Sequence, residues 1–181
     1  MVEVNKEKIL GEKRRNLLLQ WLRESSSPLT GSRLAERTNV SRQVIVQDIS
    51  LLKARNYPIL ATAQGYMLIP GETENTKRKK IVCFHEDDPA VTAKELNLIV
   101  DHGATVIDVS IEHPLYGDIT ASLMLSSRRD VKQFIDRLSS SNAGLLSALT
   151  DGTHLHTIEA ASDEVLDEVV QILDQEGFLL K

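Results

Sequence analysis

Two histidines, His154 and His156, stand two positions apart in a segment near the C-terminus that favours a β-strand. Residues i and i+2 of a strand point to the same face of a sheet, so both imidazoles would converge on one point, as they do around a chelated divalent metal. An isolated pair of this kind is also consistent with two polar residues on the solvated face of an edge strand. The strands and helices predicted around the two histidines distinguish between these interpretations.

Strands and helices alternate in the sequence beyond Lys80, and one of these strands carries the two histidines. The patterning predicts strands over 81–85, 105–112, 119–126, 154–161 and 178–180, and helices over 92–101, 128–139 and 163–175. This order favours a mainly antiparallel sheet with helices packed on one face, an α+β sandwich. The segment contains no Gly-rich phosphate loop and no nucleophile elbow.

The first 70 residues have a different pattern, which is mainly α-helical. Helices are predicted over 11–24, 31–37 and 41–55, with Thr30 and Ser41 as N-caps of the second and third. Two short strands within 58–69 then surround a turn at Gln64 and Gly65. This order resembles the winged helix-turn-helix, the type of module that many bacterial repressors carry at the N-terminus.

The third helix has one apolar face, with Ile45, Ile49 and Leu52, and one polar face. Such a polar face suits the recognition helix that a helix-turn-helix inserts into the DNA major groove, although an ordinary amphipathic helix has the same pattern. The residues expected to contact DNA are Ser41, Arg42, Gln43 and Gln47 of the helix, and Gln64 and Tyr66 of the wing. One such module buries too little surface to be selective, so a homodimer on a pseudo-palindromic operator in double-stranded DNA is expected.

Charge divides the 181 residues into two parts. The net charge of -5 combines eleven Lys or Arg against six Asp or Glu through Pro70 with ten against twenty thereafter. A basic N-terminal part is expected of a module that meets phosphate. We therefore predict a DNA-binding domain over 1–70, a linker over 71–80 that ends in four cations, and a regulatory domain over 81–181.

Several classes of protein are disfavoured by composition. The longest apolar runs are much shorter than a membrane span, and the N-terminus lacks the apolar segment of a signal peptide, so a cytoplasmic protein without a membrane partner is expected. The single cysteine, Cys83, excludes an intramolecular disulfide and favours a buried small side chain, to which the sequence assigns no chemistry.

Motifs of the C-terminal part carry a family resemblance. They are His85, Glu95-Leu96, the segment from Asp108 to Gly117, and the segment from Gly152 to Ile158. In this order they resemble the three-histidine (3H) domain. Joined to a winged helix, that domain is similar to the NiaR family, the nicotinate-responsive repressors of bacterial NAD biosynthesis and niacin salvage.

The resemblance implies a divalent metal held at His85, Glu95, His154 and His156. Three imidazoles and one carboxylate suit zinc, nickel, iron or cobalt better than calcium or magnesium. Glu95 has an alternative, because Thr92-Ala93-Lys94-Glu95 is also a capping box in which the glutamate would bond to the Thr92 amide.

The resemblance also implies that nicotinic acid binds at Asp108, His113, Tyr116 and Gly117. An imidazole can pair with a carboxylate, a tyrosine ring can stack on a pyridine, and a glycine permits close approach. Asp108 could equally satisfy backbone groups at a strand end, and His113-Pro114 could be a structural turn. The residues alone would tolerate nicotinamide as well as the acid.

A repressor with nicotinic acid as co-repressor is the function that these motifs favour, with no enzymatic activity. Two alternatives remain at the level of sequence. One is a metal-sensing repressor. The other is a metalloenzyme with an appended DNA-binding domain, for which only Glu159 and Asp108 could supply a base.

Overall fold

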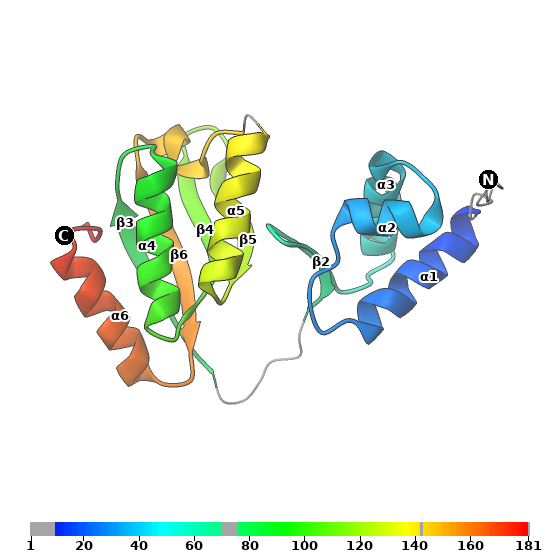
Figure 1. Cartoon of the computed structure of the whole chain (residues 1–181). Coiled ribbons are helices and arrows are strands. Elements are labelled where there is room, and N and C mark those ends of the chain that lie inside the picture. Colours follow the sequence, from blue (N-terminus) through cyan, green and yellow to red (C-terminus); the bar gives the residue numbers. More distant parts are fainter. Residues whose placement is uncertain (1–9, 70–75, 142, 181) are drawn as a thin grey trace, which may run out of the picture. The chain divides into compact units, whose positions relative to one another are not determined.

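A computed structural model describes residues 10–69, 76–141 and 143–180. The chain divides into two compact units, Met1–Gly71 and Glu72–Lys181. The N-terminal unit is mainly helical and the C-terminal unit is built on a four-stranded sheet (Figure 1). Each unit has its own core, so the predicted fold class, a winged helix-turn-helix followed by an α+β sandwich, is confirmed.

Three helices pack around one apolar core in the N-terminal unit: α1 (Gly11–Glu24), α2 (Gly31–Thr38) and α3 (Arg42–Ala54). The start positions of α2 and α3 follow from capping, since Thr30 accepts a hydrogen bond from the Arg33 amide and Ser41 accepts one from the Val44 amide. The turn between α2 and α3 passes through Asn39 in the left-handed region, at φ 51°. The core residues shared by the three helices include Leu18, Leu22, Leu34, Ile45, Ile49 and Leu52.

The wing is the antiparallel pair β1 (Ile59–Thr62) and β2 (Gly65–Leu68). Its first residue after the turn, Gly65, has φ 137°, and a Cβ there would lie 2.5 Å from the Leu29 carbonyl oxygen. Leu29 and Tyr66 exchange two backbone hydrogen bonds of 2.8 Å, which tie the wing to the loop before α2. Glycine is therefore the residue that lets the wing approach the helices.

The C-terminal unit is a two-layer sandwich. Its sheet has the order β3-β6-β4-β5 and is antiparallel throughout, with β3 (Lys77–Phe84), β4 (Thr105–His113), β5 (Gly117–Leu125) and β6 (Thr153–Ala160). Helices α4 (Pro89–Asp101), α5 (Arg128–Ser140) and α6 (Asp163–Gln175) cover the same face of this sheet (Figure 1). A short 3-10 helix, η1 (Leu146–Thr150), precedes β6 and was not predicted.

Strand β3 begins at Lys77, four residues before the predicted start. The linker expected over 71–80 is therefore wrong in its second half, whereas residues 71–75 lie outside the described part of the chain. Lysines and arginines suit this position because β3 is an edge strand, where exposed cations oppose pairing with another sheet. Arg78 is held by Glu159 at 2.6 Å, so the run is ordered by ion pairs across to β6.

Helix α4 begins at Pro89, three residues earlier than predicted. Asp88 caps the helix by accepting from the Ala90 amide at 2.7 Å, and Pro89 occupies the first turn, where a missing amide is tolerated. At the other end of the chain, the predicted strand over 178–180 is reduced to a single bridge between Leu179 and Cys83. Among the described helices, none combines the length and apolar character needed to cross a membrane.

The N-terminal unit depends on one buried ion pair between α1 and α3. Asp48 is buried and accepts hydrogen bonds from Arg14 Nε at 2.5 Å and from Arg15 Nη1 at 3.1 Å. A buried carboxylate with two guanidinium partners is stable only as a set, because removing one charge leaves the others uncompensated.

We expect Asp48→Asn to lower the free energy of unfolding of the N-terminal unit by about 3 kcal/mol, because the substitution keeps the size but removes the charge. Urea unfolding followed by the fluorescence of Trp21, the only tryptophan, measures this. Glu12→Gln is the control: Glu12 pairs with Arg15 at an exposed position, so the change should stay within about 1 kcal/mol. Equal stability of the two variants would contradict a central role for Asp48.

Candidate metal centre

Two neighbouring strands and one helix bring the predicted metal ligands together. Along β6, alternate residues are buried, so His154 and His156 both face the helices. His85 follows the last residue of β3, the strand that pairs with β6. Glu95 lies on the sheet-facing side of α4 and is fully buried. The structure therefore places all four predicted ligands in one cluster between sheet and helix.

The three imidazoles converge on a single carboxylate oxygen. The distances from Glu95 Oε2 to Nε2 are 3.1 Å for His85, 3.4 Å for His154 and 3.5 Å for His156. The rings of His85 and His154, and those of His154 and His156, stand edge to face with centroids 4.9 Å apart. Adjacent ligands of an ion with bonds of ~2.1 Å are separated by ~3–3.5 Å, so the carboxylate and each imidazole are spaced as two ligands would be.

Backbone carbonyls fix which nitrogen of each ring faces the centre. Nδ1 lies 2.7 Å from the Glu86 carbonyl in His85, 2.8 Å from the Gly152 carbonyl in His154 and 2.8 Å from the Asp108 carbonyl in His156. A carbonyl only accepts, so each Nδ1 must carry the proton that it donates. In a neutral ring Nε2 then carries a lone pair, which points toward the centre of the cluster. Metal-binding histidines in proteins are commonly oriented in this way.

The electrostatics of the cluster require a cation. Burial by itself would raise the pKa of Glu95, yet that pKa lies well below its usual value because three histidines surround the carboxylate. Burial would likewise lower the pKa of His85 and His156, yet both are raised because the Glu95 carboxylate faces them. Neutral rings would direct three lone pairs at a negative oxygen, so either protons or a metal ion must lie between them.

The donor set fits a transition metal. Glu95 Oε1 is buried without a hydrogen-bond partner in the described parts of the chain, as expected of a carboxylate that has a further interaction to make. Nitrogen donors with one carboxylate suit zinc, nickel, iron or cobalt, whereas calcium and magnesium prefer oxygen. The capping-box alternative is wrong, because Asp88 caps α4 and Thr92 lies inside the helix with its hydroxyl on the Asp88 carbonyl.

Cys83 lies in the same cluster, which the sequence analysis missed. Its Sγ, one Glu95 oxygen and one His154 nitrogen all lie within 4.8 Å of one another. Burial, together with the nearby Glu95 carboxylate, raises the pKa of the thiol. The spacing of two residues that places His154 and His156 on one face of the sheet also applies to Cys83 and His85, and could have predicted the position of Cys83. In the structure, Cys83 on β3 pairs with His154 on β6.

Two further residues position the ligands. Gly152 has φ 95°, and a Cβ there would lie 2.3 Å from the His85 carbonyl oxygen, so glycine is required for β6 to enter beside His85. Asp108 follows an irregularity in β4, where its carbonyl orients His156 and its Oδ1 accepts from the Thr157 amide at 3.1 Å. Asp108 therefore supports the centre from the neighbouring strand.

The structure does not gather the four predicted effector residues into one place. His113, Tyr116 and Gly117 lie at the β4–β5 turn, in which His113 Nδ1 accepts from the Tyr116 amide at 3.3 Å and Tyr116 is 73% exposed. Asp108 lies five residues earlier on an extended strand, ~16 Å away.

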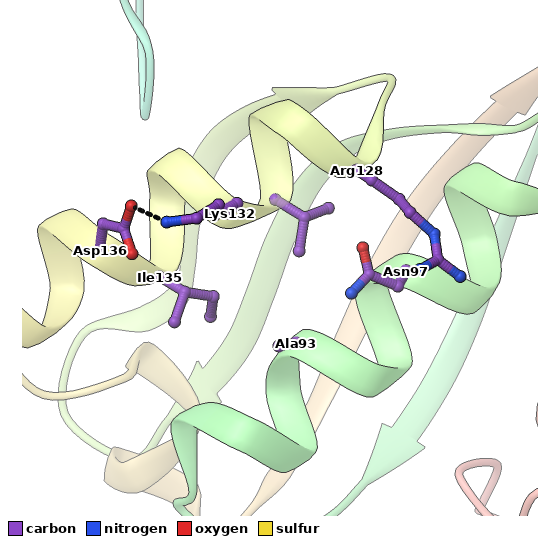
Figure 2. A pocket seen from close by; sticks show the side chains of 7 residues that line it. Ala93, Asn97, Arg128, Lys132, Ile135 and Asp136 are labelled. Carbon is purple, nitrogen blue, oxygen red and sulfur yellow. Dashed lines mark hydrogen bonds and ion pairs between the residues drawn. The ribbon is translucent and has the colours of Figure 1, made fainter.

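A cavity of about 300 Å³ opens between α4 and α5 (Figure 2). Its lining residues are Ala93, Asn97, Arg128, Val131, Lys132, Ile135 and Asp136. Its two cations are engaged by carboxylates, Arg128 by Asp101 at 2.5 Å and Lys132 by Asp136 at 2.7 Å. Since Ala93 and Asn97 each stand two residues from Glu95, they lie on another side of α4.

The predicted DNA-contacting residues divide into exposed and packed positions. Arg42, Gln43 and Gln47 are exposed along α3, and Ser41 is exposed while capping it. Tyr66 is half-buried, because its ring packs against the core. Arg42 and Tyr66 atoms both lie within 3.5 Å of the position that a Cβ on Gly31 would take, so recognition helix and wing meet at the start of α2.

Comparisons with known proteins agree with both units. The 3H domain model matches residues 78–181, and a model of an HTH domain matches residues 14–67. The chain is 51% identical over 176 residues to the transcription repressor NadR of Bacillus subtilis strain 168, which covers 96% of this chain and 97% of that protein. It is 34% identical over 174 residues to a Thermotoga maritima protein named "Probable transcription repressor NiaR", with 96% and 97% covered.

These relatives are transcription repressors rather than enzymes, and they match this chain across both domains. Of the two candidate bases for a metalloenzyme, Glu159 pairs with Arg78 on the opposite face of β6, and Asp108 Oδ1 accepts from the Thr157 amide. The chain belongs to the NiaR-type transcription repressors, which join an N-terminal helix-turn-helix to a C-terminal 3H domain.

Proposed function

We propose that this DNA-binding repressor acts on genes of NAD biosynthesis and niacin salvage, and that nicotinic acid, bound at a metal ion in the 3H domain, is its co-repressor. The observation that carries the proposal is the convergence of three histidine Nε2 atoms on the buried carboxylate of Glu95. The choice of effector comes from the family resemblance.

The metal would be held by His85, Glu95, His154 and His156. When bound, it would supply a Lewis-acid position that accepts a carboxylate oxygen or a pyridine nitrogen, both of which nicotinic acid has. The protein contributes the orientation of the imidazoles through three backbone carbonyls and a dry site between sheet and helix.

DNA would be bound by the exposed face of α3. Arginine and glutamine are residue types that pair with base edges in the major groove, and Arg42, Gln43 and Gln47 present them there. Gln64, at the turn of the wing, and Tyr66 would reach the DNA backbone or the minor groove. Because one module buries little surface, we expect a homodimer on an operator with two half-sites.

Co-repression is a coupling between two binding sites and must be reciprocal. If nicotinic acid strengthens operator binding, operator DNA strengthens the binding of nicotinic acid by the same factor. A metal-sensing repressor would instead respond to free metal and ignore nicotinic acid.

Titration calorimetry with nicotinic acid and nicotinamide tests the effector. We expect the acid to bind the metal-loaded protein, and to lose binding after chelation or in the variant His156→Ala, because the metal provides the contact to its carboxylate or ring nitrogen. His102→Ala is the matched control, since His102 ends α4 with Nδ1 on the Leu98 carbonyl at 2.7 Å, outside the centre. Binding of the acid to chelated protein, or loss of binding in the control, would contradict a metal-held effector.

Salt dependence on a random DNA duplex tests the interface without knowledge of the operator. Arg42→Ala should weaken binding and reduce the slope of log K against log salt by about 1, the release of one phosphate-bound counterion. Arg23→Ala on α1 is the charge-matched control and should leave the slope unchanged. An equal effect of both substitutions would indicate that net charge, rather than the face of α3, attracts the DNA.

A further inference from the structure

Cys83 is the one residue of the central cluster to which the proposed function gives no role. It is completely buried on β3, and its register partner on β6 is His154. Sγ, a Glu95 oxygen and a His154 nitrogen lie within 4.8 Å of one another, so these three residues form a group that could hold a metal ion. Donors on opposite sides of an ion with bonds of ~2.1 and ~2.3 Å are ~4.4 Å apart, so little movement would bring them around one ion.

Burial of charge is the second consideration. A divalent ion with one carboxylate and neutral imidazoles keeps a net charge of +1 between sheet and helix, where uncompensated charge is costly. Glu95 Oε1 adds an independent observation, because it is buried in this cluster and has no hydrogen-bond partner in residues 10–69, 76–141 and 143–180. One further anionic donor would make the centre neutral.

We infer that Cys83 supplies its sulfur, as a thiolate, to the metal held by Glu95 and the histidines, so that the centre combines nitrogen, oxygen and sulfur donors. This inference rests on the metal centre of the proposed function. On binding, the S–H bond breaks, a metal–sulfur bond forms and the proton passes to water, with no change of oxidation state. A sulfur donor favours zinc, nickel, iron or cobalt over magnesium and calcium.

Coordination by Cys83 would also limit the number of positions at which an effector could bind the metal. Five protein donors leave one position of an octahedral shell, which a carboxylate oxygen or a pyridine nitrogen could occupy. The contrary interpretation is that Cys83 is an inert packing residue, as many buried cysteines are. The two differ in whether any sulfur lies within bonding distance of the ion.

X-ray absorption spectroscopy of the zinc-loaded full-length protein distinguishes them. We expect one sulfur scatterer at ~2.3 Å besides nitrogen and oxygen at ~2.0–2.1 Å, and its loss in both Cys83→Ser and Cys83→Ala. Because the chain has a single cysteine, a thiolate scatterer has no other source. Zinc affinity, measured by competition with a chelator, should fall at least ~10-fold in both variants, the lower range for loss of even an outer-shell partner.

Ile81→Val is the matched control. Ile81 is the preceding inward-facing residue of β3, paired with His156, so the substitution changes packing beside the centre without changing a donor. It should keep the sulfur scatterer and bind zinc within ~3-fold of the parent, since it removes one methylene from the core.

The outcomes separate this inference from the function on which it rests. One zinc per chain with only nitrogen and oxygen neighbours would overturn the role of Cys83 and leave the four-residue centre standing. A sulfur scatterer that persists in Cys83→Ala would also overturn it, since the sulfur would then come from a methionine. Absence of stoichiometric zinc binding in the parent protein would overturn both the centre and the inference.

Discussion

The C-terminal domain is organised around a buried negative charge. Glu95 is fully inaccessible on the inner side of α4, and an isolated carboxylate in such a place would take up a proton rather than stay charged. It remains ionised because three imidazoles face it at 3.1–3.5 Å. The burial of an ionised Glu95 therefore depends on positive charge at this one point, whether protons or a metal ion supply it.

Strand register makes that convergence possible. Side chains alternate between the two faces of a sheet, so a slip of one residue between β3 and β6 would move His154 and His156 to the face without helices. The pairing is held at both ends: Gly152 admits β6 beside His85, and the Arg78–Glu159 ion pair joins the other end of the same two strands. The irregularity in β4 then places the Asp108 carbonyl on His156. Residues whose side chains lie outside the cluster thus determine the direction in which these imidazoles point.

Sequence patterns were sufficient for most of the fold because the principal elements have strong local determinants. Apolar periodicity and the caps Thr30 and Ser41 define the three helices of the N-terminal domain, and alternation defines the strands. The start of β3 was not predicted because four consecutive cations are typical of a solvent-exposed linker. In the structure Arg78 pairs with Glu159 of β6 and Lys79 pairs with Asp167 of α6, and these partners are distant in the sequence. The start of α4 was missed because Thr92 offers a second plausible cap.

The cluster of predicted metal ligands was accessible to sequence reasoning in the same way, but its surroundings were not. Two histidines at positions i and i+2 of a strand are predicted to share one face of the sheet. The backbone carbonyls that bind Nδ1, and so direct Nε2 into the cluster, cannot be predicted, because every residue type has a carbonyl. The apolar neighbours Val82 and Phe84 indicate that Cys83 is a buried packing residue. Cys83 is also two positions from His85, however, and this spacing predicts that both side chains lie on the same face of the sheet. Asp108 was assigned to the effector from the family resemblance, and the contact of its backbone carbonyl with His156 could not be predicted from the type of its side chain.

Helix α4 joins the metal centre to the rest of its domain. It presents Glu95 to the sheet and, on another side, Ala93 and Asn97 to the cavity against α5. A helix of 13 residues moves as a rigid body, because its backbone hydrogen bonds resist bending over ~20 Å. A movement of α4 together with Glu95 would therefore change the space between α4 and α5. For an effector bound at the proposed metal, this helix would be a direct structural connection to the outer surface of the domain.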